Sequence, residues 1–282
     1  MEANGPNAEQ IEYWNKQAGP KWVADVEQLD TMLAPLGLAV VARAAPRTGE
    51  RVIDVGPGLG QTLLQLAEKV GPTGSVLGVD ISTPMLDGAR ARVRAAGVTH
   101  VSLLNADAQT HSFAPASADL LFSRFGVMFF LEPVAAFANL AKALRPGGRF
   151  AFVCWQALAK NVWMTEPLAA VAKHVTLPAP GDPHAPGPFA FADAERTRGI
   201  LERAGFRDVR FESLTGDIRI GKDLDQATQI ASDVGAAGRV LREAPEGARK
   251  AAIAAIRETL ATRVTANGVS LPYAAWIVTG SR

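Results

Sequence analysis

Residues 52–60, VIDVGPGLG, constrain the fold of this chain more than any other stretch. The stretch begins as an apolar, β-branched strand, breaks into glycines and runs into a helical pattern over residues 61–68. Glycines allow the backbone to approach a ligand closely, and the start of a helix offers unpaired N–H groups. A strand, a glycine turn and a helix in this order predict a nucleotide-type binding site.

The acid Asp54 distinguishes this turn from a dinucleotide site. It precedes Gly56 in the order D-x-G-x-G-x-G, whereas the dinucleotide fingerprint is G-x-G-x-x-G. Gly60 therefore comes too early for the dinucleotide pattern, and a carboxylate is hard to place beside a pyrophosphate. A carboxylate suits a ligand that is cationic or donates hydrogen bonds, which favours an amino-acid-bearing nucleoside over NAD.

Composition limits the classes of function. The chain has 282 residues, of which 48% are hydrophobic, enough for one large α/β domain or for one domain with a substantial cap. A net charge of +1 gives no electrostatic case for nucleic acid or an anionic membrane. The single cysteine, Cys154, excludes an internal disulfide and a multi-cysteine metal site, and we expect no metal. The polar start and the short apolar stretch 32–42 predict no signal peptide, no membrane span and a cytoplasmic setting.

Strand and helix patterns alternate up to residue 155, which predicts a doubly wound, mostly parallel sheet. An irregular Pro/Gly-rich run over residues 178–188 interrupts this alternation, and long inserts of this kind are often functional. We therefore expect four parts. These are an N-terminal helical lid (1–45), a Rossmann-like core (46–155), an insert or acceptor cap with a helix (156–204), and C-terminal strands and helices completing the sheet (205–282).

The N-terminal part reads as a helix over residues 8–30, with a break expected at Gly19 and Pro20. It carries Tyr13, Trp14 and Trp22 in a chain with 7% aromatic residues. Two interpretations stay open here. The aromatic rings fix the helix to the core, or they form a lid that closes over a ligand.

Two further acids follow predicted strands. Asp80 ends the strand 76–79 and lies about 20 residues after Gly60, the spacing at which an acid meets ribose hydroxyls. Its alternative role is to cap the helix that starts near residues 82–84. Asp107 follows the strand 101–104 and can accept a hydrogen bond from an exocyclic amine such as that of adenine, or cap a turn.

Taken together, the motifs at 52–60, 78–81 (GVDI), 106–108 (ADA) and 144–148 (LRPGG) resemble the class I S-adenosylmethionine-dependent methyltransferases, in the group that includes ubiquinone and menaquinone methyltransferases. The resemblance is good over residues 50–155. The remainder of the chain resembles the family only in the arrangement of its predicted elements. It implies a Rossmann-like sheet of about seven strands with the last antiparallel, which residues 273–279 can supply.

The resemblance also implies a site for S-adenosylmethionine, with S-adenosylhomocysteine as product. Asp54 would hold the methionine part, Asp80 both ribose hydroxyls, and Asp107 the adenine amine. The other expected cofactor contacts are Gly56, Gly58, Gly60, Thr62, Ile81, Met85, Ala108, Ser123 and Trp22.

Methyl transfer from a sulfonium is a direct displacement, so alignment and exclusion of water are the main contributions expected of the protein. Arg124, His174 and His184 are the candidate catalytic groups, although lone histidines are more often structural. An aromatic pocket predicts a small hydrophobic acceptor as the partner, and a homodimer is compatible with the sequence. The expected acceptor residues are Tyr13, Phe125, Met128, Trp155, Asn161, Trp163, Phe189 and Phe191.

Two other functions compete with methyl transfer. The first is binding of S-adenosylmethionine for a different reaction, which the lack of a recognisable base allows. The second is a nicotinamide oxidoreductase, against which Asp54 and the early Gly60 argue. Nucleic-acid methylation is disfavoured because no basic stripe is present.

Overall fold

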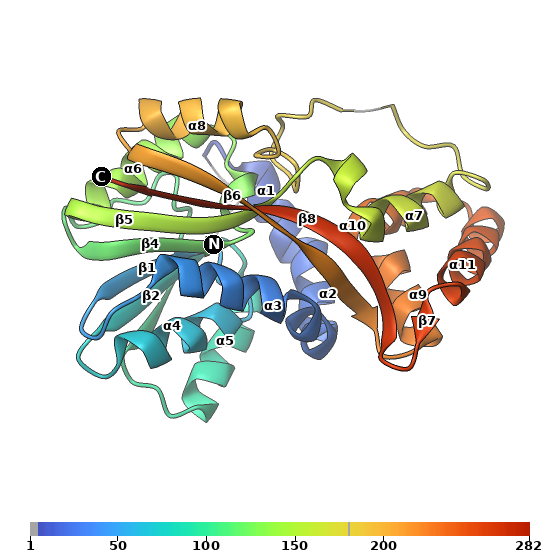
Figure 1. The fold of residues 1–282 in the computed structure, drawn as a ribbon, viewed down its shortest axis with the longest axis horizontal. Coiled ribbons are helices and arrows are strands. Elements are labelled where there is room, and N and C mark those ends of the chain that lie inside the picture. Colours follow the sequence, from blue (N-terminus) through green and yellow to red (C-terminus); the bar gives the residue numbers. More distant parts are fainter. Residues whose placement is uncertain (1–4, 180) are drawn as a thin grey trace. The chain divides into compact units, whose positions relative to one another are not determined.

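The computed structural model describes residues 5–179 and 181–282, and the elements are labelled in Figure 1. The chain divides into two compact units. The first comprises Met1–Cys154, His184–Ser213 and Trp276–Arg282, and the second comprises Trp155–Pro183 and Leu214–Ala275. Residues 1–4 of the predicted lid lie outside the described part of the chain. None of the helices over the described ranges is long and apolar enough to cross a membrane.

The first unit is built on parallel strands. They are β1 (Arg51–Val55), β2 (Ser75–Asp80), β3 (Val101–Asn105), β4 (Ala118–Arg124) and β5 (Leu144–Trp155). Parallel pairing joins β3 to β2, β2 to β1, β1 to β4 and β4 to β5. The order of strands reverses between β1 and β4, and open α/β sheets bind ligands in the crevice beyond the carboxyl ends of the strands at such a point.

The remaining strands complete the sheet. They are β6 (Arg207–Gly221), β7 (Val264–Thr265) and β8 (Gly268–Ser281). The order is β3-β2-β1-β4-β5-β8-β6, with β7 paired to β8 off this path. The predicted Rossmann-like fold, mostly parallel with antiparallel final strands, is confirmed. Over the described residues the sheet has eight strands, since the short β7 forms a hairpin with β8.

Helices cover the sheet of the first unit. They are α3 (Val26–Ala44), α4 (Gln61–Val70), α5 (Thr83–Ala95), α6 (Pro133–Ala143) and α8 (Ala194–Arg203). On α4, Leu63, Leu66, Ala67 and Val70 are buried, and this i, i+3, i+4, i+7 spacing forms one apolar stripe. That stripe explains why α4 packs against β1 and β2, as Figure 1 shows, and so fixes the glycine turn that precedes it.

The N-terminal helices break at different residues from those predicted. The chain forms α1 (Ala8–Lys16) and α2 (Ala18–Ala24), so Gln17 and Asp25 separate the helices. Gly19 and Pro20 lie in the first turn of α2. A proline is tolerated in this turn, because its missing N–H would have no partner within the helix.

Strands β4 and β5 include residues singled out in the sequence. Ser123 and Arg124 belong to β4. The LRPGG motif at 144–148 lies within β5, where the pairing with β4 shifts register between Ala118 and Leu120. A glycine at Gly147 with φ of +72° accommodates this irregularity.

The second unit contains helices and the distal halves of β6 and β8. Its helices are α7 (Val162–Val171), α9 (Leu224–Asp233), α10 (Gly235–Glu243) and α11 (Glu246–Ala261). Val234 has an extended conformation and separates α9 from α10. Helices α7 and α9 each pack against both α10 and α11.

Candidate functional site

The glycine turn after β1 is packed directly against the turn after β4. Gly56 has a φ of +69°, and a Cβ at this position would lie 2.7 Å from the Cα of Gly126. A Cβ on Gly126 would lie 2.4 Å from the carbonyl oxygen of Val55. The Ser123 hydroxyl fastens these turns, because it donates to the Val55 carbonyl at 2.7 Å and accepts from the Gly126 N–H at 3.1 Å. Only glycines permit this approach of two backbones at the crevice between β1 and β4.

Asp54 is completely buried at the carboxyl end of β1. Its Oδ2 accepts a hydrogen bond of 2.5 Å from the hydroxyl of Thr62, in the first turn of α4. Its Oδ1 is buried and has no hydrogen-bond partner among the residues that the structure describes. Burial raises the pKa of Asp54 to about 7, and the Thr62 hydrogen bond and the charge of Arg124 only partly offset this. An open, buried carboxylate oxygen fits a ligand that supplies a donor or a positive charge.

The raised pKa of Asp54 predicts a pH-dependent cost to stability that Asp54→Asn removes. The folded protein binds the Asp54 proton more tightly than the unfolded chain, whose value is 3.8. The unfolding free energy of the wild type should therefore fall as pH rises from about 4 through about 7. The variant should lack this contribution, so its stability relative to the wild type should rise between about pH 4 and about pH 7. Urea unfolding across this range measures the difference, and parallel curves would contradict the assignment.

Asp80 ties the glycine turn to the loop after β2. Its Oδ2 accepts from the N–H of Gly58 at 3.0 Å, and its Oδ1 accepts from the N–H of Ser82 at 2.8 Å. Burial raises the pKa of Asp80 to about 6, against these backbone hydrogen bonds. Both oxygens retain acceptor capacity, because a carboxylate has about four lone-pair positions. The bond from the Ser82 N–H lies at the start of α5, since Ser82 directly precedes this helix, so the ribose role and the helix-capping role of Asp80 both stay predictions.

Asp107 lies beyond β3 in a buried polar cluster that the sequence did not predict. Its carboxylate accepts from the side-chain amide of Asn7 at 2.9 and 3.0 Å and from the N–H of Gln109 at 2.9 Å. Asn7 in turn accepts from the N–H of Leu131 at 2.9 Å. The predicted neighbours Met85 and Ala108 are also buried. Three acids thus follow neighbouring strands at one edge of the sheet.

Arg124 is held in a network of charged and polar groups at the end of β4. Its guanidinium donates to Gln61, whose amide donates to the carbonyl of Asp30 at 3.2 Å. Asp30 pairs with Arg92, which reaches the carbonyl of Leu59 in the glycine turn at 3.3 Å. Burial lowers the pKa of Arg124, and the charges of Asp30 and Asp54 oppose that effect. The network therefore stabilises the turn, and a catalytic role for Arg124 stays a prediction.

Aromatic and sulfur-containing side chains gather beyond β4 in the first unit. Phe125 has a φ of +63°, and the 3-10 helix η1 (Val127–Phe129) follows it. The Phe129 ring lies 5.2 Å from Trp14, which lies 5.7 Å from Tyr13 and 5.8 Å from Trp22. The Met128 carbonyl accepts from the N–H of Gly187 at 3.0 Å. These contacts bring the aromatic residues of α1 and α2 to the turn beyond β4.

The other predicted acceptor residues have different surroundings. Phe191 is buried 5.8 Å from the ring of Phe137 in the first unit. In the second unit, the rings of Trp155 and Trp163 lie 5.3 Å apart, and the buried Trp163 indole N–H has no partner within the described ranges. Asn161 donates to the Gln156 carbonyl at 3.1 Å and accepts from the Ala274 N–H at 3.1 Å. Phe189 is half-buried. Their role toward an acceptor stays a prediction.

The two candidate histidines differ in environment from the acids at the strand ends. His174 follows α7 in the second unit, and His184 belongs to the first unit. Both histidines are exposed, whereas Asp54, Asp80 and Asp107 are buried. Over the described ranges, no group of three or more His, Cys, Asp or Glu side chains is arranged to hold a metal ion. A catalytic role for either histidine stays a prediction.

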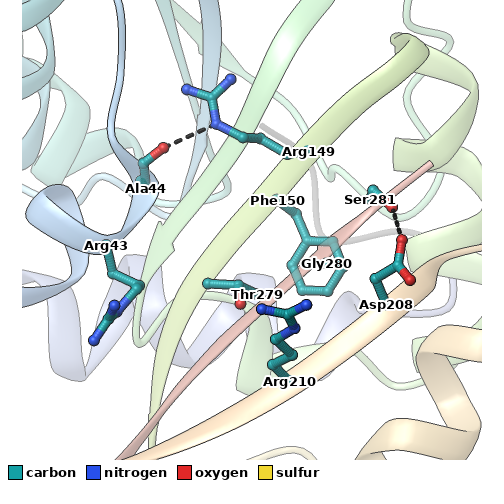
Figure 2. A pocket seen from close by; sticks show the side chains of 9 residues that line it. All are labelled: Arg43, Ala44, Arg149, Phe150, Asp208, Arg210, Thr279, Gly280 and Ser281. Atoms are coloured by element: carbon teal, nitrogen blue, oxygen red, sulfur yellow. Dashed lines mark hydrogen bonds between the residues drawn. The ribbon is translucent and has the colours of Figure 1, made fainter.

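A separate hollow of about 240 Å³ is lined by residues of β5, β6, β8 and the end of α3 (Figure 2). Arg149 lines it and is in register with Leu120, which pairs with Val52 near the start of β1. The guanidinium of Arg149 is already bonded to Glu50 at 2.7 and 2.8 Å and to the Ala44 carbonyl at 2.9 Å. Asp208 in the hollow accepts from Ser281 at 2.8 Å. This hollow is therefore distinct from the crevice at the carboxyl ends.

Comparison with known proteins agrees with this geometry. Residues 52–148 match the family model described as "Methyltransferase domain". The chain is 42% identical to aklanonic acid methyltransferase DauC of Streptomyces sp. (strain C5) over 118 residues, which are 42% of this chain and 54% of that enzyme. It is 28% identical to nocamycin O-methyltransferase of Saccharothrix syringae over 262 residues, covering 87% and 90% of the two chains. Among solved structures, the [4+2]-cyclase SpnF has a TM-score of 0.54 at 18% identity, over 94% of this chain and 95% of that one.

Residues 52–148 belong to the methyltransferase-domain family, and the predicted resemblance to the class I S-adenosylmethionine-dependent methyltransferases is confirmed. The matched domain agrees with the predicted enzyme class and cofactor, and both are taken up under the proposed function. The match to DauC spans about half of that enzyme, so the acceptor has to be inferred from the site itself.

Proposed function

We propose that this protein transfers the methyl group of S-adenosylmethionine to a small hydrophobic or aromatic acceptor. The observation that carries the proposal is the buried Oδ1 of Asp54, which has no partner in the described part of the chain and lies where the strand order reverses. The amino-acid part of the cofactor supplies a cationic donor for that oxygen. Asp80 has free acceptor capacity for the ribose hydroxyls, and Asp107 for the adenine amine. The buried acids therefore fit the three parts of this cofactor.

The cofactor supplies a methyl group on a positively charged sulfur. The residues of the protein bind the cofactor and orient the acceptor toward it. Asp54 balances positive charge at the end of β1, where a cation would lower its raised pKa. The turn from Phe125 to Phe129 lines the carboxyl end of β4 beside Gly56. Apolar side chains at this position exclude water and align an acceptor, which is the main requirement of a direct displacement.

The chemistry of the acceptor follows from the surrounding side chains. Phe125 and Met128 offer apolar surface in the first unit, together with Tyr13. The two relatives are enzymes named for aklanonic acid and nocamycin, which accords with an acceptor other than a macromolecule. Because both candidate histidines are exposed while the acids are buried, the favoured acceptor is an acidic hydroxyl or carboxyl that needs no strong base.

Incubation with S-adenosylmethionine and a panel of phenols and aromatic carboxylic acids tests this proposal. We expect S-adenosylhomocysteine and a methylated acceptor to form in equal amounts, measured by mass spectrometry. The matched control is Asp54→Asn, which keeps the shape of the side chain and should abolish turnover. Conversion of an acceptor without release of S-adenosylhomocysteine would favour the competing reaction class, because SpnF shows that a cyclase can share this fold.

A further inference from the structure

Helix α1 is fastened at both ends by asparagines that no sequence motif singled out. Asn7 directly precedes α1, and Asn15 lies in its last turn. Each side chain bonds a loop that follows a strand of the sheet, Asn7 after β3 and Asn15 after β2. These are the loops that carry Asp107 and Asp80.

The Asn15 amide joins α1 to the loop after β2. Its Nδ2 donates to the carbonyl of Ile81 at 2.9 Å, and its Oδ1 accepts from the N–H of Thr83 at 2.9 Å. The Ser82 hydroxyl adds a bond of 3.0 Å to the carbonyl of Trp14. Asn15 thus takes the role of a capping side chain for α5, whose own N-cap residue Ser82 makes no such bond.

The Asn7 amide joins the chain to the carboxylate of Asp107. Asn7 and Asp107 are only 4% and 8% exposed, so the bonds between them are shielded from water. The Nδ2 atom lies 2.9 Å from Oδ1 and 3.0 Å from Oδ2. The Gln109 N–H takes a further position on Oδ1, at 2.9 Å. No second donor is recorded for Oδ2 within the described ranges, so this oxygen retains an acceptor position.

We propose that Asn7 is a positioning residue that orients Asp107 for recognition of a 6-aminopurine, while Asn15 holds α1 over the same part of the site. The inference rests on the proposed function, since it assumes an adenosyl cofactor. With Asn7 and Gln109 fixing the carboxylate plane, Oδ2 presents an acceptor and no donor. A 6-amino group donates to such an oxygen, and a 6-oxo group is repelled by it.

Calorimetric titration with S-adenosylhomocysteine and its 6-oxo analogue S-inosylhomocysteine tests this role. The wild type should prefer the amino compound by at least tenfold. Asn7→Ala should reduce that preference to less than threefold, because Asp107 is free to rotate. Asn15→Ala should weaken both ligands equally and keep the preference, and the control Asn267→Ala, on the exposed turn between β7 and β8, should change neither.

A reciprocal exchange, Asn7→Asp with Asp107→Asn, sharpens the test. The exchange restores an amide–carboxylate pair but reverses which residue is the donor. The side chain at position 107 is then an amide, and it directs an N–H toward the purine. We expect the preference to invert toward the 6-oxo analogue, with α1 protected from proteolysis as in the wild type. An unchanged preference for the amino compound in Asn7→Ala would overturn the proposal. Failure of the wild type to bind either ligand would instead contradict the proposed function.

Discussion

Replacing Asp80 by alanine is expected to weaken the binding of S-adenosylhomocysteine by at least tenfold, or ~1.4 kcal/mol. The side chain accepts from the N–H groups of Gly58 and Ser82, and it is the acceptor proposed for the ribose hydroxyls. The alanine variant loses the ribose contacts and also leaves two backbone donors without their partner. Calorimetric titration at a temperature well below the melting point of the variant measures this loss.

The matched control for Asp80 is Asp87, an acid on α5 that pairs with Arg90 on the surface. Asp87→Ala should bind the ligand as the wild type does, because its side chain lies 65% exposed in a solvent-screened pair. Equal affinity of Asp80→Ala and the wild type would remove Asp80 from the site. Loss of the folded state in Asp80→Ala would be visible as a collapsed melting transition, and Asp80→Asn then provides the milder substitution.

Gly56→Ala should destabilise the protein by at least ~2 kcal/mol and abolish ligand binding. The added Cβ meets the Cα of Gly126 at 2.7 Å, and the φ of +69° is unfavourable for alanine. The contacting backbone atoms lie just beyond the ends of β1 and β4, so neither turn can move without disturbing the crevice. Urea unfolding gives the stability difference, and titration with S-adenosylhomocysteine gives the change in affinity.

The control substitution Gly97→Ala separates the effect of backbone strain from the effect of the steric clash at Gly56. Gly97 has a φ of +66° at the end of α5, and a Cβ there would meet nothing within 4 Å. Gly97→Ala should therefore cost only about 1 kcal/mol and leave ligand binding intact. If the two alanine variants lost equal stability and bound the ligand equally, the close approach of Gly56 to Gly126 would have no energetic consequence, and the crevice would not depend on it.

Local patterns in the sequence were sufficient to predict the sheet and the acids at its edge. The β-branched run before Gly56, the stripe on α4 and the strand ends at Asp80 and Asp107 each depend on residues close in the chain. Parallel strands then bring their carboxyl ends to one edge, which places Asp54, Asp80 and Asp107 near each other. Alternation of strand and helix therefore predicted a doubly wound, mostly parallel sheet.

Contacts between distant residues could not be predicted in this way. The bond from Asn7 to Asp107 spans 100 positions, and an asparagine before a helix reads equally well as an ordinary N-cap. The network of Gln61, Asp30 and Arg92 around Arg124 likewise joins separate elements. The break at Gln17 instead of Gly19 was missed because a proline in the first turn of a helix costs little.

Parallel calorimetric titration of the purified protein with S-adenosylmethionine, S-adenosylhomocysteine and NADH tests the assignment of the cofactor crevice most directly. We expect the two adenosyl ligands to bind with dissociation constants on the order of micromolar, and NADH to produce no heat. Loss of adenosyl binding in Asp54→Asn would assign that heat to the crevice between β1 and β4. Binding of NADH, with silence from both adenosyl ligands, would contradict an S-adenosylmethionine site in this protein.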